Sequence, residues 1–217
     1  ATVRKKEDGR YEMLSGHRRL RASQLIGAET LRCEIVELDR DAATIFMCDS
    51  NLQRTTILPS EKAFAYKMRL EAMKNQGKRT DLTSATMLRK SVEARDIIGE
   101  DVGESRETVR KYIRLTELIP EILDMVDDGK IGFRPAVEIS YLPSNLQEEL
   151  LDQMKMEDCT PSHDQALRMK GLYRQELLTP EVIAVIMQEE KPNQKEKIVL
   201  RDERARSLLP KDLPINK

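Results

Sequence analysis

The sequence predicts an α+β protein that is mostly helical, with a small α/β domain followed by an all-α helix-turn-helix domain. Strand-like and helical patterns alternate within about the first fifty of 217 residues, and helical patterns dominate the remainder. Aromatic residues make up 4% of the chain and Trp is absent, which favours modest helical cores. We place the α/β domain at residues 1–58, a connecting helix and loop at 59–80, the helix-turn-helix domain at 81–175, and a C-terminal helix and linker at 176–217.

Charge is unevenly distributed along the chain, although the net charge is only −1. Residues 1–32 hold eight Lys or Arg against four Asp or Glu, whereas residues 120–164 hold three against eleven. The net charge argues against a uniformly basic nucleic-acid coat. A basic N-terminal part and an acidic C-terminal part are compatible with a protein that binds a polyanion through one face.

The cysteines and the hydropathy indicate the compartment. Cys33, Cys48 and Cys159 are widely spaced and form no CxxC pair, so the sequence indicates neither a disulfide framework nor a zinc site. No apolar run approaches the ~20 residues that span a bilayer, and no signal peptide is visible. We therefore expect a cytoplasmic protein without a membrane partner.

The first chemically distinctive stretch covers residues 11–27, YEMLSGHRRLRASQLIG. A strand over residues 11–14 meets a tight Ser15-Gly16 turn, and a helix begins with His17, Arg18 and Arg19. The free N–H groups of a first helical turn bind anions, and arginine adds forked hydrogen bonds to phosphate oxygens. Basic residues normally favour the last turn of a helix. The arrangement therefore favours phosphate binding, with a solvated basic helix as the alternative.

Residues 30–54 predict a strand, a helix and a polar segment. Leu31, Cys33 and Ile35 alternate with charged residues, as in a half-buried strand, and residues 39–48 read as a helix. Residues 49–54, DSNLQR, can contact a base edge, a phosphate or a hard cation. Taken alone, an ordinary helix end followed by a loop explains this segment better.

A strong helix is predicted over residues 61–74, and a polar loop over residues 75–86. Phe64, Met68 and Ala72 recur at helical spacing in this helix, as do Ala65 with Met68, and Tyr66 with Leu70 and Met73. We interpret them as residues of the core.

The second distinctive stretch covers residues 94–118 and predicts a helix-turn-helix. Ile97, Ile98 and Val102 form one apolar face, Gly103 ends that helix, and Ser105 can cap the next. The second helix, over residues 106–115, is expected to bury Val109, Ile113 and Tyr112. Such a helix enters the DNA major groove, with its later basic residues on phosphates. A helical hairpin with a solvated charged face is the alternative. The candidate DNA contacts are Ser105, Arg106, Glu107, Thr108, Arg110, Lys111, Arg114 and Arg134.

Further helices are predicted over residues 146–156, 164–173 and 180–190. They are expected to buttress the helix-turn-helix. His163 lies just before one of them and is interpreted as a surface or capping residue rather than a ligand.

Taken together, SGHRRLRAS, SNLQR, a helix opening at LPSE and the helix-turn-helix resemble the ParB/RepB partition family over residues 11–150. The stretches ILPSEKAFAYK and ESRETVRKYIRLTELIPEILDMVDDGKI are most similar to ParB-like proteins of mobile elements in Gram-positive bacteria. The resemblance implies a sulfiredoxin-like N-domain that binds CTP and Mg²⁺. It also implies a homodimeric clamp on a centromere-like DNA site at the nucleoid, with a ParA-type ATPase as a partner.

The resemblance also implies which residues bind the nucleotide. The family's GERR box falls on Gly16-His17-Arg18-Arg19, with His17 in place of Glu, and its ENxQR box falls on residues 50–54. Ser50 replaces the Glu that helps to hold the metal and supports hydrolysis, so at most a weak CTPase is expected. The implied nucleotide site comprises Ser15, Gly16, His17, Arg18, Arg19, Asn51, Gln53 and Arg54, with Asn51 as the candidate Mg²⁺ ligand.

The family's base-reading box normally precedes this start, and its dimerisation segment normally follows this end, so we expect truncation at both. Two rival functions remain open from the sequence. One is a transcription regulator or nucleoid-occlusion-type DNA binder. The other is a nuclease or phosphotransferase on the same fold, against which stands the lack of an obvious nucleophile–base pair.

Overall fold

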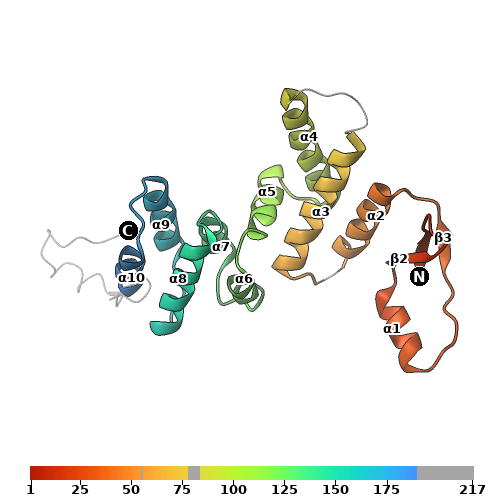
Figure 1. Cartoon of the computed structure of the whole chain (residues 1–217), viewed down its shortest axis with the longest axis horizontal. Helices are drawn as coiled ribbons and strands as arrows, with labels where there is room; N and C mark the ends of the chain where they lie inside the picture. Colours follow the sequence, from red (N-terminus) through yellow and green to blue (C-terminus); the bar gives the residue numbers. More distant parts are fainter. Residues whose placement is uncertain (55, 78–83, 190–217) are drawn as a thin grey trace, which may run out of the picture. The chain divides into compact units, whose positions relative to one another are not determined.

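The computed structural model describes residues 1–54, 56–77 and 84–189 (Figure 1). Three short strands and two helices form the first part of the chain and only helices follow, which confirms the predicted fold class. The strands are β1 (Thr2–Lys5), β2 (Tyr11–Ser15) and β3 (Glu34–Val36). The helices are α1 (His17–Leu25), α2 (Arg40–Leu52), α3 (Pro59–Gly77), α4 (Ser84–Val102), α5 (Arg106–Leu115), α6 (Pro120–Asp127), α7 (Phe133–Ile139), α8 (Ser144–Met156), α9 (His163–Arg174) and α10 (Pro180–Gln188). The predicted C-terminal linker and the centre of the loop predicted at 75–86 lie outside the described residues.

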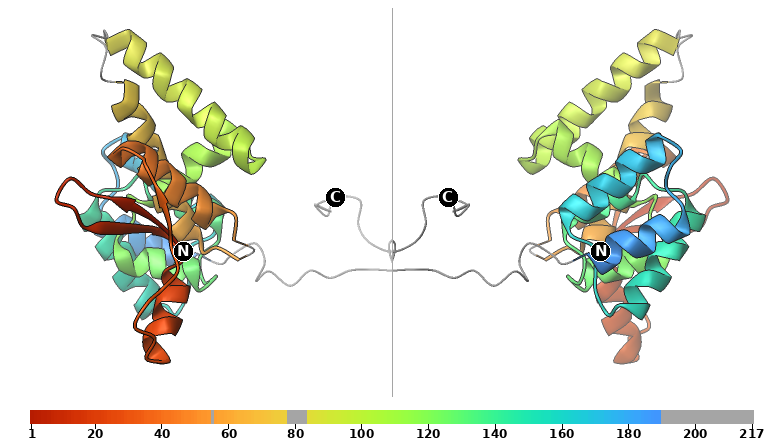
Figure 2. Two further views of the ribbon diagram at one scale, coloured as in Figure 1. Left: turned by 90° about the vertical axis from the view of Figure 1, so that its right-hand side faces the viewer. Right: turned by 90° about the vertical axis from the view of Figure 1, so that its left-hand side faces the viewer.

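The sheet has the strand order β2-β1-β3. β1 pairs antiparallel with β2, and parallel with β3, where Val3 lies opposite Ile35. The predicted strand before Gly16 and the helix after it are confirmed, and Figure 2 shows both from the side. The predicted half-buried strand is shorter than expected. Leu31 is half-buried as expected, but the expected burial of Cys33 and Ile35 is wrong, since Cys33 is exposed and Ile35 is 57% exposed.

Helices α2 and α3 pack against each other. The Asp39 carboxylate caps α2 by accepting the Ala42 N–H at 2.8 Å. Helix α2 continues to Leu52, four residues beyond the predicted end, so most of the polar DSNLQR segment lies on its last turn. The predicted α3 is confirmed, as is the core assignment of Tyr66, Leu70 and Ala72, but the core assignment of Phe64 and Met68 is wrong.

The buried face of α3 explains that error. Ala63, Tyr66 and Leu70, spaced three and four residues apart, are buried, whereas Phe64 and Met68 lie on the other side, 47% and 40% exposed. Both sides of the helix carry apolar residues, so their spacing alone does not decide which side is covered.

The helix-turn-helix forms as predicted from α4, a turn and α5. Gly103 adopts a left-handed φ of 70°, and the Ser105 hydroxyl accepts the Thr108 N–H at 3.1 Å. Val109 is buried, and Tyr112 and Ile113 are partly buried as expected. Ile97 is 46% exposed, so its place on the buried face of the first helix is wrong.

Gly99 allows the tight turn between these two helices. A Cβ built on Gly99 would lie 2.4 Å from the Glu104 carbonyl oxygen, and the Glu104 N–H donates to the Gly99 carbonyl at 2.8 Å. No heavier side chain fits at this close approach, since real Cβ contacts are almost never shorter than 3.0 Å.

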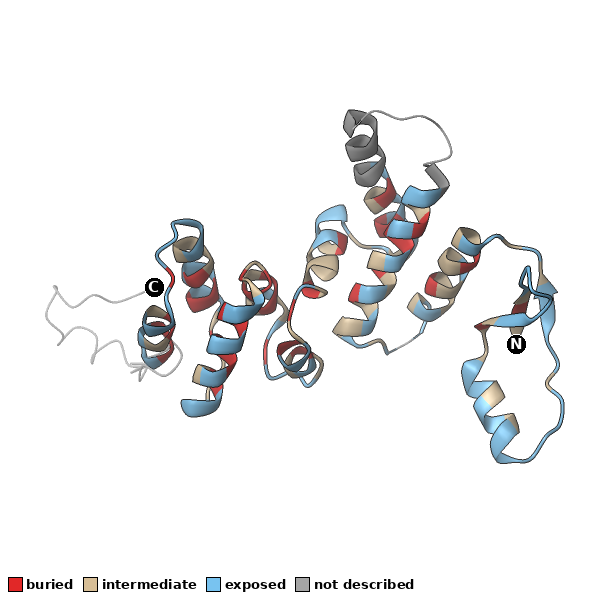
Figure 3. Cartoon of the chain, in the orientation of Figure 1, coloured by how far each residue is buried: buried red, intermediate tan, exposed pale blue. Residues whose placement is uncertain are grey.

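Two hydrophobic cores lie against α5. The smaller one contains Tyr66, Ile98 and Val109, and the larger one joins α5 to α6–α10. Its fully buried side chains include Leu115, Ile122, Leu150, Met169 and Ile183 (Figure 3). The buried Gln147 amide links the layers: its oxygen accepts the Ile119 N–H at 2.9 Å, and its nitrogen donates to the Leu142 carbonyl at 2.8 Å. The predicted later helices are therefore confirmed as a buttress for α5.

Residues Ala1–Met187 form one compact unit. Among the residues that the structure describes, no helix is both long enough and apolar enough to cross a membrane.

Candidate nucleotide and DNA interfaces

The turn at Gly16 is shaped so that only glycine fits. Its φ is 105°, and an added Cβ would lie 2.7 Å from Ala1 Cβ and 2.9 Å from Ala1 Cα. Gly16 is the N-cap of α1 and makes no side-chain cap bond, and the first turn contains no acidic residue. The N–H groups of this turn therefore remain available to an external acceptor.

The first turn of α1 presents two arginines and a histidine without partners in the described part of the chain. His17, Arg18 and Arg19 are exposed, and none has a hydrogen bond or ion pair within the described part of the chain. The positive end of the helix dipole lies beside them, and the first turn contains no carboxylate to offset this positive charge. An anion that accepts several hydrogen bonds suits this turn.

The two sequence boxes that the resemblance identified meet in space. Ser15, at the end of β2, and Ser50, on the last turn of α2, lie with their hydroxyl oxygens 2.9 Å apart. Asn51, Gln53 and Arg54 follow Ser50 and are exposed. A cleft of about 280 Å³ includes Arg54 but none of the first-turn residues of α1. The Gly16 turn and the α2 end are therefore neighbours without sharing this cleft.

A buried arginine that the sequence reasoning missed stands beside the second box. Arg69 on α3 is only 5% exposed, and it forms ion pairs with Asp49 of α2, at 3.1 Å, and with Asp101 of α4. The three residues line a second cleft of about 560 Å³ with Gln53. Arg69 thereby links the box on α2 to the first helix of the helix-turn-helix. No pattern in the sequence indicated this burial, because apolar residues lie on both sides of α3.

The environment of Arg69 changes the acidity of its neighbours. Burial raises the pKa of Asp49, Arg69 partly offsets this, and Asp101 adds to the rise. Burial also raises the pKa of the Cys48 thiol to about 11. The Asp49 carboxylate is thus the partner of Arg69 in the folded chain.

The described residues contain no group of three His, Cys, Asp or Glu side chains that could hold a metal ion. Mg²⁺ usually binds proteins through one or two oxygen ligands together with substrate phosphates and waters. The exposed Asn51 amide oxygen fits that kind of site, in which a nucleotide supplies most of the ligands. An all-protein Mg²⁺ site does not fit these residues.

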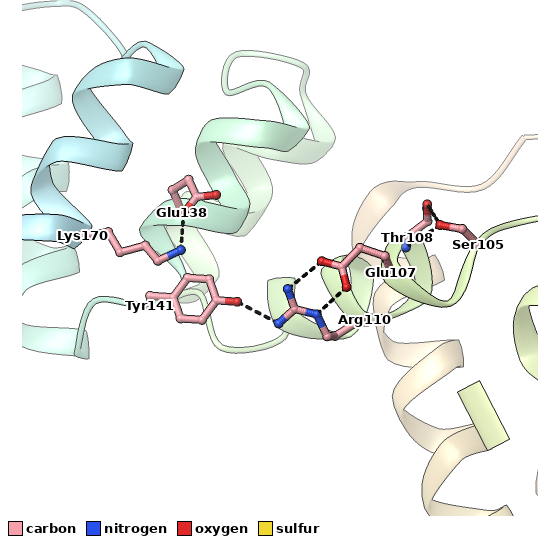
Figure 4. A network of polar contacts seen from close by, with 7 residues as sticks. All are labelled: Ser105, Glu107, Thr108, Arg110, Glu138, Tyr141 and Lys170. Atoms are coloured by element: carbon pink, nitrogen blue, oxygen red, sulfur yellow. Dashed lines mark hydrogen bonds and ion pairs between the residues drawn. The ribbon is translucent and has the colours of Figure 1, made fainter. Parts of the chain in front are cut away.

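The outer face of α5 carries the predicted DNA contacts. Arg106 is exposed, and its guanidinium lies 3.4 Å from the Asp96 carboxylate. Glu107 accepts two hydrogen bonds from Arg110, at 2.7 and 2.9 Å, which lower the pKa of Glu107 (Figure 4). Within the described chain, Lys111 has no hydrogen-bond or ion-pair partner. The same holds for Arg134, the predicted contact on α7.

Arg114 differs from the other predicted DNA contacts because it faces the protein. Its guanidinium donates to the Ser140 carbonyl and lies 4.4 Å from the centre of the Tyr141 ring. Its Nε is buried without a hydrogen-bond partner in the described structure. Arg114 therefore packs α5 against the end of α7.

A small α/β region with a glycine turn at the start of a helix is followed by a helix-turn-helix on a helical core, and this combination defines the class of protein. Residues 1–52 match the sequence model of the ParB N-terminal domain, and residues 83–163 match that of the ParB HTH domain. The chain belongs to the ParB family, as its motifs predicted. The mobile-element subgroup stays a prediction.

Two relatives illustrate the similarity. The probable chromosome-partitioning protein ParB of Pseudomonas putida is 31% identical over 147 residues, which cover 68% of this chain and 44% of that protein. The nucleoid occlusion protein of Bacillus cereus is 28% identical over 206 residues, covering 93% of this chain and 59% of that protein. The chain thus spans about half the length of the curated relatives that it matches.

A solved structure is also similar: the C-terminally truncated ParB of Caulobacter crescentus, complexed to the centromeric parS site. It is 24% identical, with a TM-score of 0.45, and the match covers 78% of this chain and 80% of that one.

Proposed function

We propose that this chain is a partition protein that binds a centromere-like site in double-stranded DNA as a homodimer, with CTP and Mg²⁺ bound at its N-domain. The observation that carries the proposal is α5, a helix capped by Ser105. Its outer face bears the exposed Arg106 and the half-buried Lys111, and its other face packs on a core. The match to the ParB HTH domain and the chromosome-partitioning relatives support this reading. A ParA-type ATPase is the proposed partner.

The DNA contacts divide by position on α5. Ser105, Arg106 and Thr108 lie at the end of the helix that faces base edges in a helix-turn-helix complex. Lys111 and Arg134 are proposed phosphate contacts, because they are cations without carboxylate partners in the described structure. Arg110 is held by Glu107 and is proposed to join the interface in that fixed orientation.

The nucleotide is proposed to lie at the Gly16 turn. The first-turn N–H groups with Arg18 and Arg19 suit its phosphates, and Asn51, Gln53 and Arg54 lie on the neighbouring α2 end. CTP would supply the anionic phosphates and most ligands of Mg²⁺. Hydrolysis is proposed to be weak, because Ser50 stands where the family has Glu, and Ser50→Glu is expected to increase phosphate release.

DNA reading is tested first, by fluorescence anisotropy on a site selected from a random double-stranded pool. Arg106→Ala is expected to cost about 1–3 kcal/mol at that site and much less on random DNA. Lys155→Ala serves as the control, because this lysine is exposed and lies on α8. Equal losses on both DNAs would remove Arg106 from base reading, and no binding by the unsubstituted chain would overturn the proposal.

Nucleotide binding is tested by calorimetric titration of CTP with Mg²⁺, using ATP, GTP and UTP as comparisons. Arg18→Ala is expected to abolish selective CTP binding. Arg10→Ala is the matched control, since that arginine is exposed but pairs with Asp8 in the hairpin turn. No binding of any nucleotide would leave DNA binding as the only function of the chain.

The second candidate function is a nucleoid-occlusion-type DNA binder. It is favoured by the length of the match to the Bacillus cereus protein, which covers 93% of this chain. Mapping bound sites across a genome separates the two: a few sites clustered near one locus indicate partition, and sites spread over the chromosome indicate occlusion.

A further inference from the structure

Tyr141, in the turn after α7, lies among four cationic side chains of α5 and α9. Its hydroxyl accepts a hydrogen bond from Arg110 at 3.2 Å (Figure 4). Lys170 Nζ lies 4.0 Å from the centre of the ring, and the guanidinium carbons of Arg114 and Arg174 lie 4.4 and 6.0 Å from it. Tyr141 thus joins cations of two helices that are far apart in sequence. We call these five residues the Tyr141 cluster.

The Tyr141 cluster has an excess of positive charge. Arg110 and Lys170 each pair with a glutamate, the latter at 2.6 Å. Neither Arg114 nor Arg174 has a carboxylate partner within the described residues. Two of the four cations are therefore not neutralised. Arg114 belongs to α5, the helix already proposed to bind a polyanion, and Arg174 belongs to α9.

Exposure distinguishes the members of the cluster. The Lys170 side chain is only 14% exposed and that of its partner Glu138 16%, so this pair is largely shielded from water. Arg114 faces the protein and donates to a backbone carbonyl. Arg174, at the C-terminal end of α9, is exposed and is held only by its approach to the ring.

We propose that Arg174 binds a DNA backbone phosphate, so that the DNA interface extends from α5 across Tyr141 to α9. The inference rests on the proposed function, since it adds a second contact to the same DNA. Tyr141, Lys170 and Arg114 are positioning residues in it: they fix the ring against which the guanidinium lies and add positive potential.

The chemistry favours a phosphate over a base edge. A planar guanidinium binds phosphate oxygens through two parallel hydrogen bonds, and contact with an aromatic ring limits its rotamers before binding. Arg174 lies on α9 rather than on the recognition helix, and a contact from outside the groove carries no sequence information. Arg110 connects the two parts, because it belongs to α5 and hydrogen-bonds Tyr141.

The test measures DNA affinity against salt concentration for the full chain on its selected site and on random DNA. Arg174→Ala is expected to weaken binding about three- to tenfold on both DNAs and to reduce the salt slope by about 0.9 for each phosphate that the variant no longer neutralises. Arg174→Lys should restore most of the slope because it restores the charge. Lys155→Ala, an exposed lysine on α8, should leave both slopes unchanged. Circular dichroism melting checks that each variant is folded.

The outcomes separate this inference from the proposed function. An unchanged salt slope for Arg174→Ala, with Arg106→Ala still losing the selected site, would overturn the Arg174 contact alone. A loss confined to the selected site would also overturn it, because a phosphate contact acts on every sequence. Absence of DNA binding by the unsubstituted chain would overturn both.

Discussion

The two proposed anion-binding regions of this chain differ in how their cations are held. At the Gly16 turn, Arg18 and Arg19 are exposed and have no partner among the described residues, and α1 has no buried residue at all. At α5, Arg110 is fixed by Glu107 and Tyr141, and the helix buries Val109 and Leu115 completely. The first region is poorly packed before its ligand binds, and the second is preorganised.

This difference has an energetic consequence. A ligand at the Gly16 turn must order a helix that gains little from packing, so part of the binding free energy is lost to that ordering. DNA at α5 contacts side chains that ion pairs and a core already hold in place, so less binding free energy is lost to ordering there. We therefore expect nucleotide binding to change the protection of α1 more than DNA binding changes that of α5.

The largest expected effect comes from a substitution that destabilises the core beneath α5 and leaves the Gly16 turn unchanged. Leu150→Ala on α8 removes a fully buried side chain from the larger core and should destabilise the fold by about 2–5 kcal/mol. Met156→Ala on the same helix is the control, since Met156 is 75% exposed. Thermal unfolding measures the stability loss, and DNA affinity should fall with it. A parallel loss of CTP affinity at low temperature would contradict the separation of the two regions.

Gly16→Ala should damage the other region. The left-handed φ costs an alanine roughly 1–2 kcal/mol, and the overlap with Ala1 adds to this. Gly27→Ala is the matched control, because Gly27 also has a positive φ but nothing within 4 Å of an added Cβ. We expect CTP affinity to fall at least tenfold in Gly16→Ala only, by calorimetry, with DNA affinity retained in both. Equal effects of the two substitutions would assign the loss to backbone strain alone.

Arg69→Met tests the link between the regions. It removes the cation between Asp49 and Asp101, and it should raise the pKa of Asp49 further, because Arg69 opposes the effect of burial. Below the pKa of Asp49 in the unsubstituted chain, the carboxyl is protonated in both proteins and the variant loses least stability. As pH rises from that pKa to the higher pKa of the variant, only the unsubstituted chain gains the charged pair of Asp49 with Arg69, so the loss should grow with pH.

Two measurements check the Arg69 prediction. Carboxyl NMR titration follows Asp49 directly, and denaturant unfolding at several pH values follows the stability difference. Lys67→Met is the control on the same helix, since Lys67 pairs with Glu117 at the surface. A stability difference that is independent of pH would show that Arg69 acts by packing alone.

Local sequence signals predicted the elements and both candidate sites, but they did not predict long-range contacts. Local sequence predicted the Ser15-Gly16 turn, the Ser105 cap and the α4–α5 pair, because each of these depends on neighbours within a few residues. The exposure of Phe64 and the burial of Arg69 depend on which elements cover α3, and no spacing within α3 encodes that. The same holds for Tyr141, whose partners come from α5 and α9.

The smallest expected effect concerns the cysteines, which report packing near the nucleotide site without disturbing it. Cys48 is 1% exposed and its pKa is raised to about 11, so its reactive thiolate is scarce in the folded chain. Cys33 is exposed before β3. Mass-resolved alkylation at pH 8 should label Cys33 quickly, and Cys48 at a rate limited by local opening.

Because Cys48 adjoins Asp49 and Arg69, Arg69→Met should increase the labelling rate of Cys48 and leave that of Cys33 unchanged. Rapid labelling of Cys48 in the unsubstituted chain would show that the α2–α3 contact opens readily, and the two regions would then be coupled more loosely than the buried Arg69 implies.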